Sequence, residues 1–557
     1  MIKYLIRKRQ FTIIGKRYIN KLFKNNLSRY FPAVLSGTAL VFAFPTFNIS
    51  LLAWICIVPF LISLYRMDGY TAFRAGLFFG LPYFFGTQSW IYYSVNHYGG
   101  VSLLPSLLIV LLLSLYESLY TALFGFLFAK AVKRTDLPLT IIAAPLWGSL
   151  EYIRGYLFSG FPWSLLGYTQ YNSLPIIQIS DITGVYGVSF LIILVNASLA
   201  DLYLLKVRQK EKPLFPNWKT LASTAVTVIV IAATLLYGVY KLRSTGTGAG
   251  DTRQVRISII QGSIEQDRKW NPAYQRKVFN TYKRLTVEAL KESPDMVVWP
   301  ETALPFYFGR DNEQTTELTE FVKKSGVALL TGTVMVKTRP VNKDTDGNSN
   351  NGYMLSNSAV LIDRTGNPVY FYDKIHLVPF GEYVPLKNTL FFLDKLVEGI
   401  GDYTPGRNYA KGNLSWGQFG TIICYEAIFP GLVRKFFRHG GNLIVNITND
   451  AWFGRTNGPY QHFSMSIFRA VENRKPLVRA ANTGISGFID ATGRVSRTTE
   501  LFKETYITED ILINDDTSFY TKYGDVFSFL NIIFTVLFFV KISNKVGRTQ
   551  KYQGGVT

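Results

Sequence analysis

The stretch Phe419-Gly-Thr-Ile-Ile-Cys-Tyr-Glu426 decides the fold of the second half of this chain. Its apolar, β-branched run predicts a short buried strand that ends at Cys424. Strand ends are where an α/β sheet presents side chains to a ligand. An unpaired cysteine is commonly a buried structural residue, but the tyrosine and the carboxylate that follow Cys424 favour a nucleophile at this position.

The only other cysteine in the sequence is Cys56, which lies in an apolar segment near the N-terminus. Two cysteines cannot make a disulfide framework, and a bond between segments of such different character is not expected. Cys424 is therefore predicted to be a lone thiol.

The composition places much of the chain in lipid. Of its 557 residues, 48% are hydrophobic and 15% are aromatic, which is typical of a chain with membrane spans and more than one domain. The net charge of +22 would suit nucleic-acid binding if it were clustered on a folded face. In a membrane protein, basic residues instead gather in cytosolic loops, so their positions decide between the two interpretations.

Eight apolar runs are each close to the ~20 residues that a membrane span needs. They cover residues 32–46, 49–65, 72–93, 102–129, 138–158, 179–205, 219–240 and 524–541. The connections after the second, fourth and sixth runs are basic, whereas those after the first, third and fifth contain no Lys or Arg. The positive-inside rule therefore predicts that both termini are cytosolic and that residues 241–523 are exported. Nucleic-acid binding loses its support, because the charge lies where membrane topology requires it.

The expected organisation has five parts. They are a basic cytosolic tail at 1–30, a membrane bundle of seven spans at 31–243, an exported catalytic domain at 251–515, an eighth span at 522–541 and a cytosolic tail at 542–557. In the exported part, strands are expected at 255–261, 296–299, 327–336, 353–362, 421–424, 443–448, 477–481 and 487–490, and helices at 272–292, 313–325, 430–439 and 460–474. Strands that alternate with helices predict a layered α/β domain.

Three segments of the exported part share one design, in which an apolar run is followed at once by a reactive polar group. They are Asp295-Met-Val-Val-Trp-Pro-Glu301, the segment from Tyr372 through Lys374 to Pro385, and Cys424-Tyr-Glu426. A thiol nucleophile needs a base for its proton, a cation for the developing oxyanion and a wall that excludes water. Glu301, Lys374 and Cys424 would supply the base, the cation and the thiol.

These segments resemble the nitrilase superfamily, in which a Glu-Lys-Cys triad lies on an αββα sandwich. The whole chain looks more closely like the apolipoprotein N-acyltransferase family of the bacterial inner membrane. The motifs that carry this resemblance include Trp299-Pro-Glu301, Lys374 through Pro385, Cys424-Tyr-Glu426, Asn449-Asp-Ala-Trp-Phe-Gly454, Gly458-Pro-Tyr-Gln-His462 and, in the membrane part, Gly160-Phe-Pro-Trp163. The resemblance implies an α-helical bundle of about eight spans that carries a nitrilase-like αββα sandwich on the periplasmic side.

The family resemblance also implies the reaction. A phospholipid, typically phosphatidylethanolamine, would acylate Cys424, and the α-amino group of the diacylglyceryl-cysteine of an apolipoprotein would then take the acyl chain. Glu301 would be the general base and Lys374 the oxyanion cation. The remaining site residues implied by the resemblance are Glu382 and Glu426, which would support Lys374, and Trp270, Asn357 and Tyr425, which would line the acyl or head-group site. His376 and His462 are interpreted as structural hydrogen-bonding residues.

Three ionisable residues, Glu117, Glu151 and Arg154, lie in apolar runs, where charges are costly and are usually functional or paired. Glu151 and Arg154 stand three residues apart on one predicted helix, so a pair between them is expected. The sequence contains neither a cluster of metal ligands nor a glycine-rich phosphate loop, and we expect no metal and no cofactor. Two other hypotheses remain: a membrane-tethered amidase that uses the same three residues, and a transporter with an exported binding domain.

Overall fold

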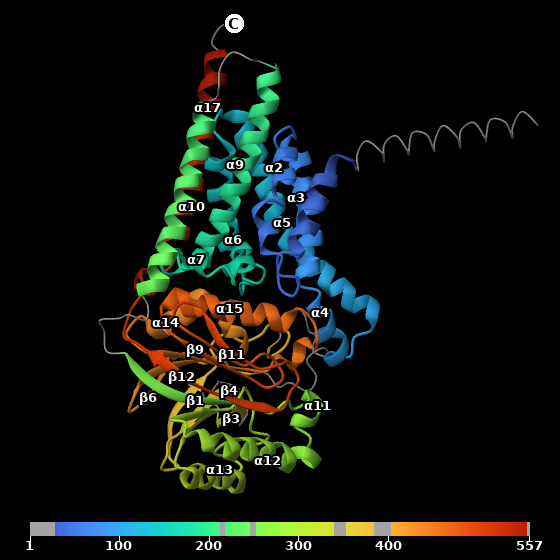
Figure 1. The fold of residues 1–557 in the computed structure, drawn as a ribbon. Helices are drawn as coiled ribbons and strands as arrows, with labels where there is room; N and C mark the ends of the chain where they lie inside the picture. The colour runs from blue at the N-terminus through green and yellow to red at the C-terminus, as the bar shows by residue number, and fades with distance from the viewer. Residues whose placement is uncertain (1–27, 212–217, 245–251, 339–352, 384–402, 554–557) are drawn as a thin grey trace, which may run out of the picture.

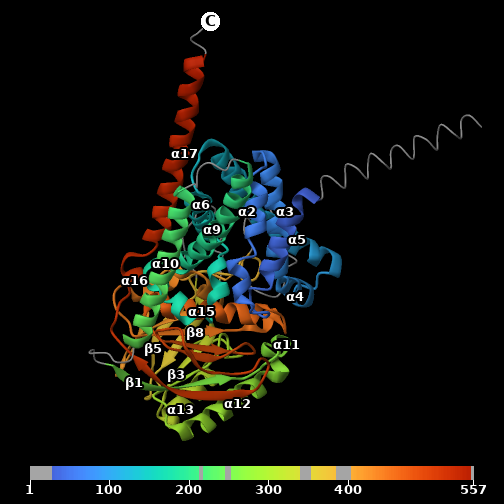
Figure 2. The ribbon, with the colours of Figure 1, turned by 45° about the horizontal axis from the view of Figure 1, so that its top comes forward.

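The protein consists of a helical bundle seated on one face of an α/β sandwich (Figure 1). The computed structural model describes residues 28–211, 218–244, 252–338, 353–383 and 403–553. Most of the predicted N-terminal tail therefore lies outside the described residues. Turning the molecule shows the same two bodies, with α10 (Trp218–Ser244) and α17 (Val526–Gln553) on the same side of the bundle (Figure 2).

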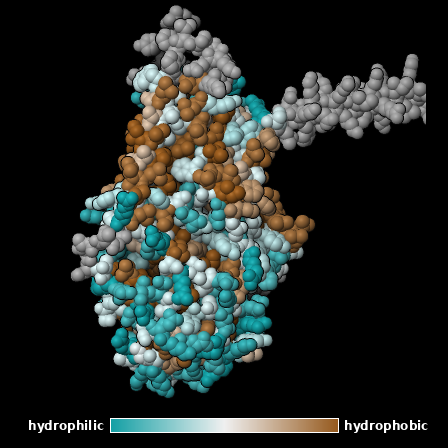
Figure 3. Space-filling model, viewed as in Figure 1, coloured by the Kyte–Doolittle hydropathy of each residue, from teal (hydrophilic) through white to brown (hydrophobic). Residues whose placement is uncertain are grey.

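The bundle contains four helices that are long and apolar enough to cross a membrane, among the residues that the structure describes. These four segments are Leu103–Arg134, Val185–Leu205, Trp218–Ser244 and Val526–Asn544. They belong to α5 (Leu103–Arg134), α9 (Val185–Glu211), α10 and α17, and the helix at 28–41, α3 (Gly69–Thr87) and α6 (Leu139–Tyr156) pack beside them. Their exposed faces form a hydrophobic belt above the polar sandwich (Figure 3).

Several predicted spans are not continuous helices, and two of them show this most clearly. The run at 49–65 contains the short 3-10 helix η1 (Ser50–Trp54) and the short α2 (Val58–Leu64), which has Pro59 in its first turn. The run at 179–205 is divided at Gly184, whose φ of 65° ends α8 (Ser180–Thr183) before α9 begins. Apolar composition therefore located both segments but did not predict their breaks.

The predicted pair between Glu151 and Arg154 is wrong. Arg154 on α6 pairs with Glu117 on α5 at 2.5 Å, and its guanidinium also donates to the carbonyl of Trp163 at 2.9 Å. Glu151 instead accepts a hydrogen bond from the backbone N–H of Leu166 at 2.8 Å. The orientation of α6 points the Arg154 side chain toward α5, so its partner lies on a neighbouring helix and not on its own. The spacing of residues along one helix does not reveal such a partner.

We expect Glu117→Gln to destabilise the protein more than Glu151→Gln. The first change leaves the buried Arg154 charge without its counter-ion, which costs about 3 kcal/mol or more. The second keeps an oxygen that can accept from Leu166 N–H. Thermal unfolding of the two variants in detergent measures the difference, and a larger loss for Glu151→Gln would contradict the Glu117 pairing.

The sandwich is built from two six-stranded sheets. The first has the order β12-β1-β2-β3-β4-β5 and the second has the order β11-β10-β9-β8-β7-β6. The strands of the first sheet are β1 (Arg253–Gln261), β2 (Met296–Val298), β3 (Ala328–Thr338), β4 (Tyr353–Ile362), β5 (Pro368–Asp373) and β12 (Thr505–Ile513). Those of the second are β6 (Lys411–Leu414), β7 (Gly417–Ile423), β8 (Leu443–Thr448), β9 (Leu477–Ala481), β10 (Gly487–Ile489) and β11 (Val495–Thr498).

Helices cover the outer face of each sheet, which gives the four-layered αββα arrangement. The first sheet is covered by α12 (Pro272–Ala289) and α13 (Asn312–Ser325), at the end of the molecule away from the bundle (Figure 1). The second is covered by α14 (Pro430–Phe437) and α15 (Gly458–Asn473), which lie between the sheet and the bundle (Figure 1). The second sheet is therefore the layer nearer to the membrane part.

Buried polar contacts join α15 to the bundle. The indole Nε1 of Trp163 donates to Gln461 at 2.6 Å, and Glu472 accepts from the backbone N–H of Val185 at 3.0 Å. At the end of the helix, the Arg474 guanidinium pairs with Asp181 at 2.8 Å. A buried charge needs its partner in place, so these contacts hold the sandwich in one orientation on the bundle.

Candidate active site

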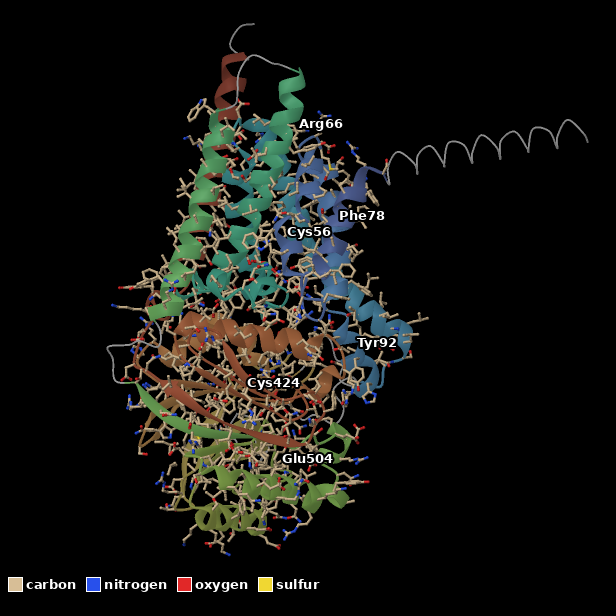
Figure 4. The ribbon with its side chains drawn as sticks, viewed as in Figure 1. Cys56, Arg66, Phe78, Tyr92, Cys424 and Glu504 are labelled. Carbon is tan, nitrogen blue, oxygen red and sulfur yellow. The ribbon has the colours of Figure 1, made fainter. Side chains whose placement is uncertain are left out.

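The structure brings Glu301, Lys374 and Cys424 to one place between the two sheets. Glu301 follows β2, Lys374 follows β5 and Cys424 follows β7. Lys374 Nζ lies 3.6 Å from Glu301 Oε1, and both of their charges act on the Cys424 thiol. Cys424 lies inside the sandwich, below the layer formed by α15 (Figure 4). Three remote segments of sequence thus meet at the ends of their strands, as the segment design predicted.

Lys374 is a buried and doubly paired cation. Its Nζ lies 2.9 Å from Glu382 Oε2, and its backbone N–H donates to the carbonyl of Asn357 at 2.8 Å. Burial alone would lower the pKa of Lys374, but the charges of Glu382 and Glu301 outweigh it and hold the pKa above its usual value. Lys374 is therefore a permanent positive charge in a site that excludes water.

The side-chain amide of Asn357 bridges Glu301 and Glu382, the two carboxylates beside this cation. Its amide nitrogen donates to Glu301 Oε1 at 2.7 Å and to Glu382 Oε1 at 2.8 Å. The second oxygen of Glu301 accepts from the backbone N–H of Asn449 at 2.8 Å. Both oxygens of Glu301 are thus held in place, which is the orientation that a base needs before it can take a proton.

Glu426 supports the cluster through the backbone. Its carboxylate accepts hydrogen bonds from the N–H groups of Ile375 at 2.7 Å and Ile423 at 2.7 Å, and from the hydroxyl of Tyr372 at 2.7 Å. Burial raises the pKa of Glu426 to about 7. Glu426 does not contact the Lys374 ammonium in these interactions; it ties the segment that follows Lys374 to the turn that carries Cys424.

Cys424 begins a turn and does not end a strand. The strand β7 stops at Ile423, and Cys424 is the first residue of the 3-10 helix η6 (Cys424–Ile428), with a φ of 50°. A non-glycine residue at positive φ is strained and often marks a functional site. Burial and the Glu301 charge raise the pKa of the Cys424 thiol to about 12. The thiol is therefore protonated at neutral pH and needs a base to become a nucleophile.

The three residues predicted to bind substrate occupy different surroundings. Asn357 lies between Glu301 and Glu382, as described. Tyr425 is buried beside Cys424, with its ring 5.8 Å from His376 and 5.2 Å from Phe429. Trp270 lies further out: its indole is 37% exposed and packs against Tyr307 with ring centroids 5.6 Å apart.

Lys269 is a site residue that the sequence did not reveal. It is fully buried, and its Nζ donates to the backbone carbonyl of Glu301 at 2.8 Å. Burial lowers the pKa of Lys269 to about 8, although the charge of Glu301 opposes this. Its neighbours Asp267 and Arg268 are charged residues of a short helix, α11 (Gln266–Lys269), so composition favours a surface position. Only the tertiary fold distinguishes the inward lysine.

The alkylation rate of Cys424 should respond in opposite directions to changes at Glu301 and Lys374. Glu301→Gln removes a negative charge that raises the thiol pKa, so the thiolate fraction and the rate with iodoacetamide rise, by about tenfold per unit of pKa. Lys374→Met removes the cation that lowers the thiol pKa, so the rate falls. Measurement at pH 9, below the thiol pKa, keeps the thiolate fraction limiting. Changes in the same direction would contradict this electrostatic arrangement.

The two domains each match a family profile, and together they define a membrane protein with a carbon-nitrogen hydrolase domain. The profile "Carbon-nitrogen hydrolase" matches residues 256–518, and "Apolipoprotein N-acyltransferase N-terminal domain" matches residues 36–198. Relatives extend the match to as much as 94% of the chain. The chain belongs to the apolipoprotein N-acyltransferase family.

Two relatives support this membership over nearly their full lengths. The apolipoprotein N-acyltransferase of Geobacter metallireducens is 41% identical over 90% of this chain and 92% of its own. That of Haemophilus influenzae is 31% identical over 94% of this chain and 96% of its own. Among solved structures, a CN-hydrolase superfamily protein from Xanthomonas campestris covers 46% of this chain and 91% of its own, with 19% identity and a TM-score of 0.34. Family membership rests on the sequence relatives.

Proposed function

We propose that this acyltransferase moves a fatty acyl chain from a phospholipid to the α-amino group of the N-terminal diacylglyceryl-cysteine of apolipoproteins, through a thioester on Cys424. N-acylation of lipoproteins is the activity of its family. The observation that carries the mechanism is the buried cluster of Glu301, Lys374 and Cys424 in a sandwich that sits on an apolar bundle. Phosphatidylethanolamine is the donor that we expect.

In the first half-reaction, Glu301 takes the proton of the Cys424 thiol as the sulfur attacks the ester carbonyl of the donor. Lys374 stabilises the oxyanion of the tetrahedral intermediate, since its ammonium is a fixed charge in a low-dielectric site. The carbonyl re-forms, the ester bond breaks, and the proton on Glu301 passes to the departing alkoxide. The products are a thioester on Cys424 and a lysophospholipid, and Glu301 is again a carboxylate.

In the second half-reaction, the neutral α-amino group of the acceptor attacks the thioester carbonyl. Glu301 accepts the proton that the nitrogen loses, and Lys374 again balances the oxyanion. The carbon–sulfur bond breaks, an amide forms, and the proton on Glu301 returns to the sulfur. The cycle ends with a free thiol on Cys424, so no outside acid, base or reductant is required.

The position of the proposed active site beside the membrane bundle supports lipid substrates. The bundle has a hydrophobic belt directly above the sandwich (Figure 3), and α15 lies between Cys424 and the bundle (Figures 1 and 4). Both substrates are anchored in a bilayer by acyl chains. A site held beside the bilayer spares the extraction of those chains into water, which costs about 0.8 kcal/mol for each CH₂ group.

We further propose that the sandwich lies on the periplasmic side of the bacterial inner membrane, with the bundle making eight spans and both termini cytosolic. Arg66 marks the end of the bundle opposite to the sandwich (Figure 4), and it lies in one of the basic connections predicted to be cytosolic. A cysteine in place of Lys324, in a background lacking Cys56 and Cys424, should react with an impermeant maleimide in intact spheroplasts. One in place of Lys133 should react only after permeabilisation; the reverse pattern would invert the topology.

The test of the function uses the purified full-length protein in vesicles of phosphatidylethanolamine with one defined acyl chain. Addition of a synthetic diacylglyceryl-cysteine peptide should yield N-acylated peptide and lysophospholipid in equal amounts, both measured by mass spectrometry. Parallel samples receive small aliphatic amides in place of the peptide. Release of ammonia from those amides, with no lysophospholipid in the peptide samples, would overturn the proposal in favour of an amidase.

A further inference from the structure

The backbone at Cys424 has an unfavourable conformation. Its φ of 50° places a residue with a side chain in the left-handed region, which is unfavourable unless neighbouring groups enforce it. Support can act on either of the two planar peptide groups that flank Cys424, because the backbone torsions of this residue set how the two are turned relative to each other.

His462 on α15 contacts one of these peptide groups directly. Its Nε2 lies 3.1 Å from the carbonyl oxygen of Cys424, and the imidazole is fully buried. The other ring nitrogen, Nδ1, lies 2.9 Å from the Arg479 guanidinium and 3.0 Å from Asp450 Oδ1. Arg479 also pairs with Asp450 at 2.9 Å. The imidazole is therefore held at both ends, between a buried ion pair and the backbone of the nucleophile.

This arrangement defines the tautomer. A carbonyl oxygen can only accept, so Nε2 carries the proton and donates to Cys424. Burial and the Arg479 charge lower the pKa of His462, so the ring is neutral and Nδ1 is free to accept from Arg479. Because a peptide is planar, the hydrogen bond to the Cys424 carbonyl also sets the direction of the Tyr425 N–H.

Aromatic side chains, one of them from the membrane bundle, pack around the His462 imidazole. The ring centroids of Trp163 and His462 are 5.9 Å apart, and those of Phe453 and His462 are 5.8 Å apart. Trp163 is in turn fixed by the Arg154 guanidinium, which donates to its carbonyl, and by Gln461, which accepts from its indole. A continuous set of contacts therefore runs from the Glu117–Arg154 pair in the bundle to the backbone of Cys424.

We propose that His462 is the positioning residue of the nucleophile, and that its donated hydrogen bond to the Cys424 carbonyl holds the strained turn in its reactive form against the wall that Trp163 provides. This inference rests on the proposed role of Cys424. His462 exchanges no proton with the substrate in this account, which separates it from the histidine of a Cys-His dyad.

Two amides of similar chemistry test the proposal. The side-chain nitrogen of glutamine reaches the place of Nε2, whereas that of asparagine reaches only the place of Nδ1. His462→Gln should therefore keep the donor to Cys424, and His462→Asn should lose it. The rate of thioester formation from phosphatidylethanolamine, per mole of folded protein, should fall by less than about tenfold in the first and by about 100-fold or more in the second. His462→Phe, which keeps the ring packing without a donor, should behave as His462→Asn.

The outcomes separate the two proposals. If the wild-type protein forms no thioester, the function proposed for Cys424 fails. The positioning role fails if the wild-type protein forms the thioester and His462→Gln is impaired as severely as His462→Asn or His462→Phe. It also fails if His462→Phe forms the thioester at the normal rate. Thermal unfolding distinguishes a loss of fold from a loss of position. Should one of the two donor-free variants not fold, the other supplies the comparison with His462→Gln.

Discussion

Cys424→Ala should abolish lipoprotein N-acylation, with a fall in transfer rate of roughly 10⁴-fold or more. In the proposed mechanism the sulfur holds the acyl chain between the two half-reactions, so neither can proceed without it. Cys424→Ser should fold normally but transfer slowly, because a hydroxyl is far harder to ionise than a thiol beside the same base. N-acylated peptide measured by mass spectrometry, and rescue of a cell depleted of its own enzyme, are the two readouts.

The other cysteine provides a matched control. Cys56 is also buried, but it lies in the bundle, well away from Cys424 (Figure 4). Cys56→Ala should leave the rate of transfer unchanged within about twofold. Full activity of Cys424→Ala, or equal losses in the two variants, would contradict the assignment of Cys424 as the acylated residue.

Lys374→Met should have the second largest effect, because it acts on both rate and stability. Loss of the cation that we propose stabilises the oxyanion should lower the transfer rate by about 10³-fold. The same change leaves Glu301 and Glu382 facing each other in a buried site, where an unpaired charge costs about 3–5 kcal/mol. Lys374→Arg keeps the charge but not the compact ammonium, so it should restore stability more than rate.

Lys337 is the matched control for this change. Its ammonium pairs with Asp373, the residue just before Lys374, but its side chain is 41% exposed. Lys337→Met should lower the free energy of unfolding by less than about 1 kcal/mol and leave the rate within about threefold. Transfer rates and thermal unfolding of the two variants in one detergent give the comparison. Similar losses at the two lysines would show that the buried cation has no special role.

The strands of the sandwich core could be predicted from the sequence with little error. The predicted strands at 443–448 and 477–481 have the bounds of β8 and β9, because both are short apolar runs that are buried on two faces. The edge strands were missed. β12 contains Glu509 and Asp510, and β5 begins at a proline, so neither shows the apolar signal of a central strand.

The membrane part was predicted less well. Hydropathy located the apolar runs but not the break at Gly184 or the short helices between residues 50 and 64. The partner of Arg154 was mistaken, because the choice between Glu151 and Glu117 depends on how α6 faces α5. Side-chain partners across helices follow from packing, and one sequence contains little information on packing.

The cluster itself was predicted from three separate segments, since each places a reactive group directly after an apolar run. The sequence could not show which residues hold the backbone of this cluster in place. Lys269 lies among charged residues, and the role of His462 depends on a backbone angle at Cys424. Both act on the backbone of the proposed catalytic residues, through contacts that exist only once the two sheets are packed together.

The most direct test of the account is the intact mass of the purified protein after incubation with phosphatidylethanolamine and no acceptor. We expect an increase equal to one fatty acyl group, located on Cys424 by peptide mapping, removed by hydroxylamine, and transferred in full to a diacylglyceryl-cysteine peptide added afterwards. An unchanged mass while the complete reaction proceeds, or an acyl group on another residue, would contradict a thioester on Cys424.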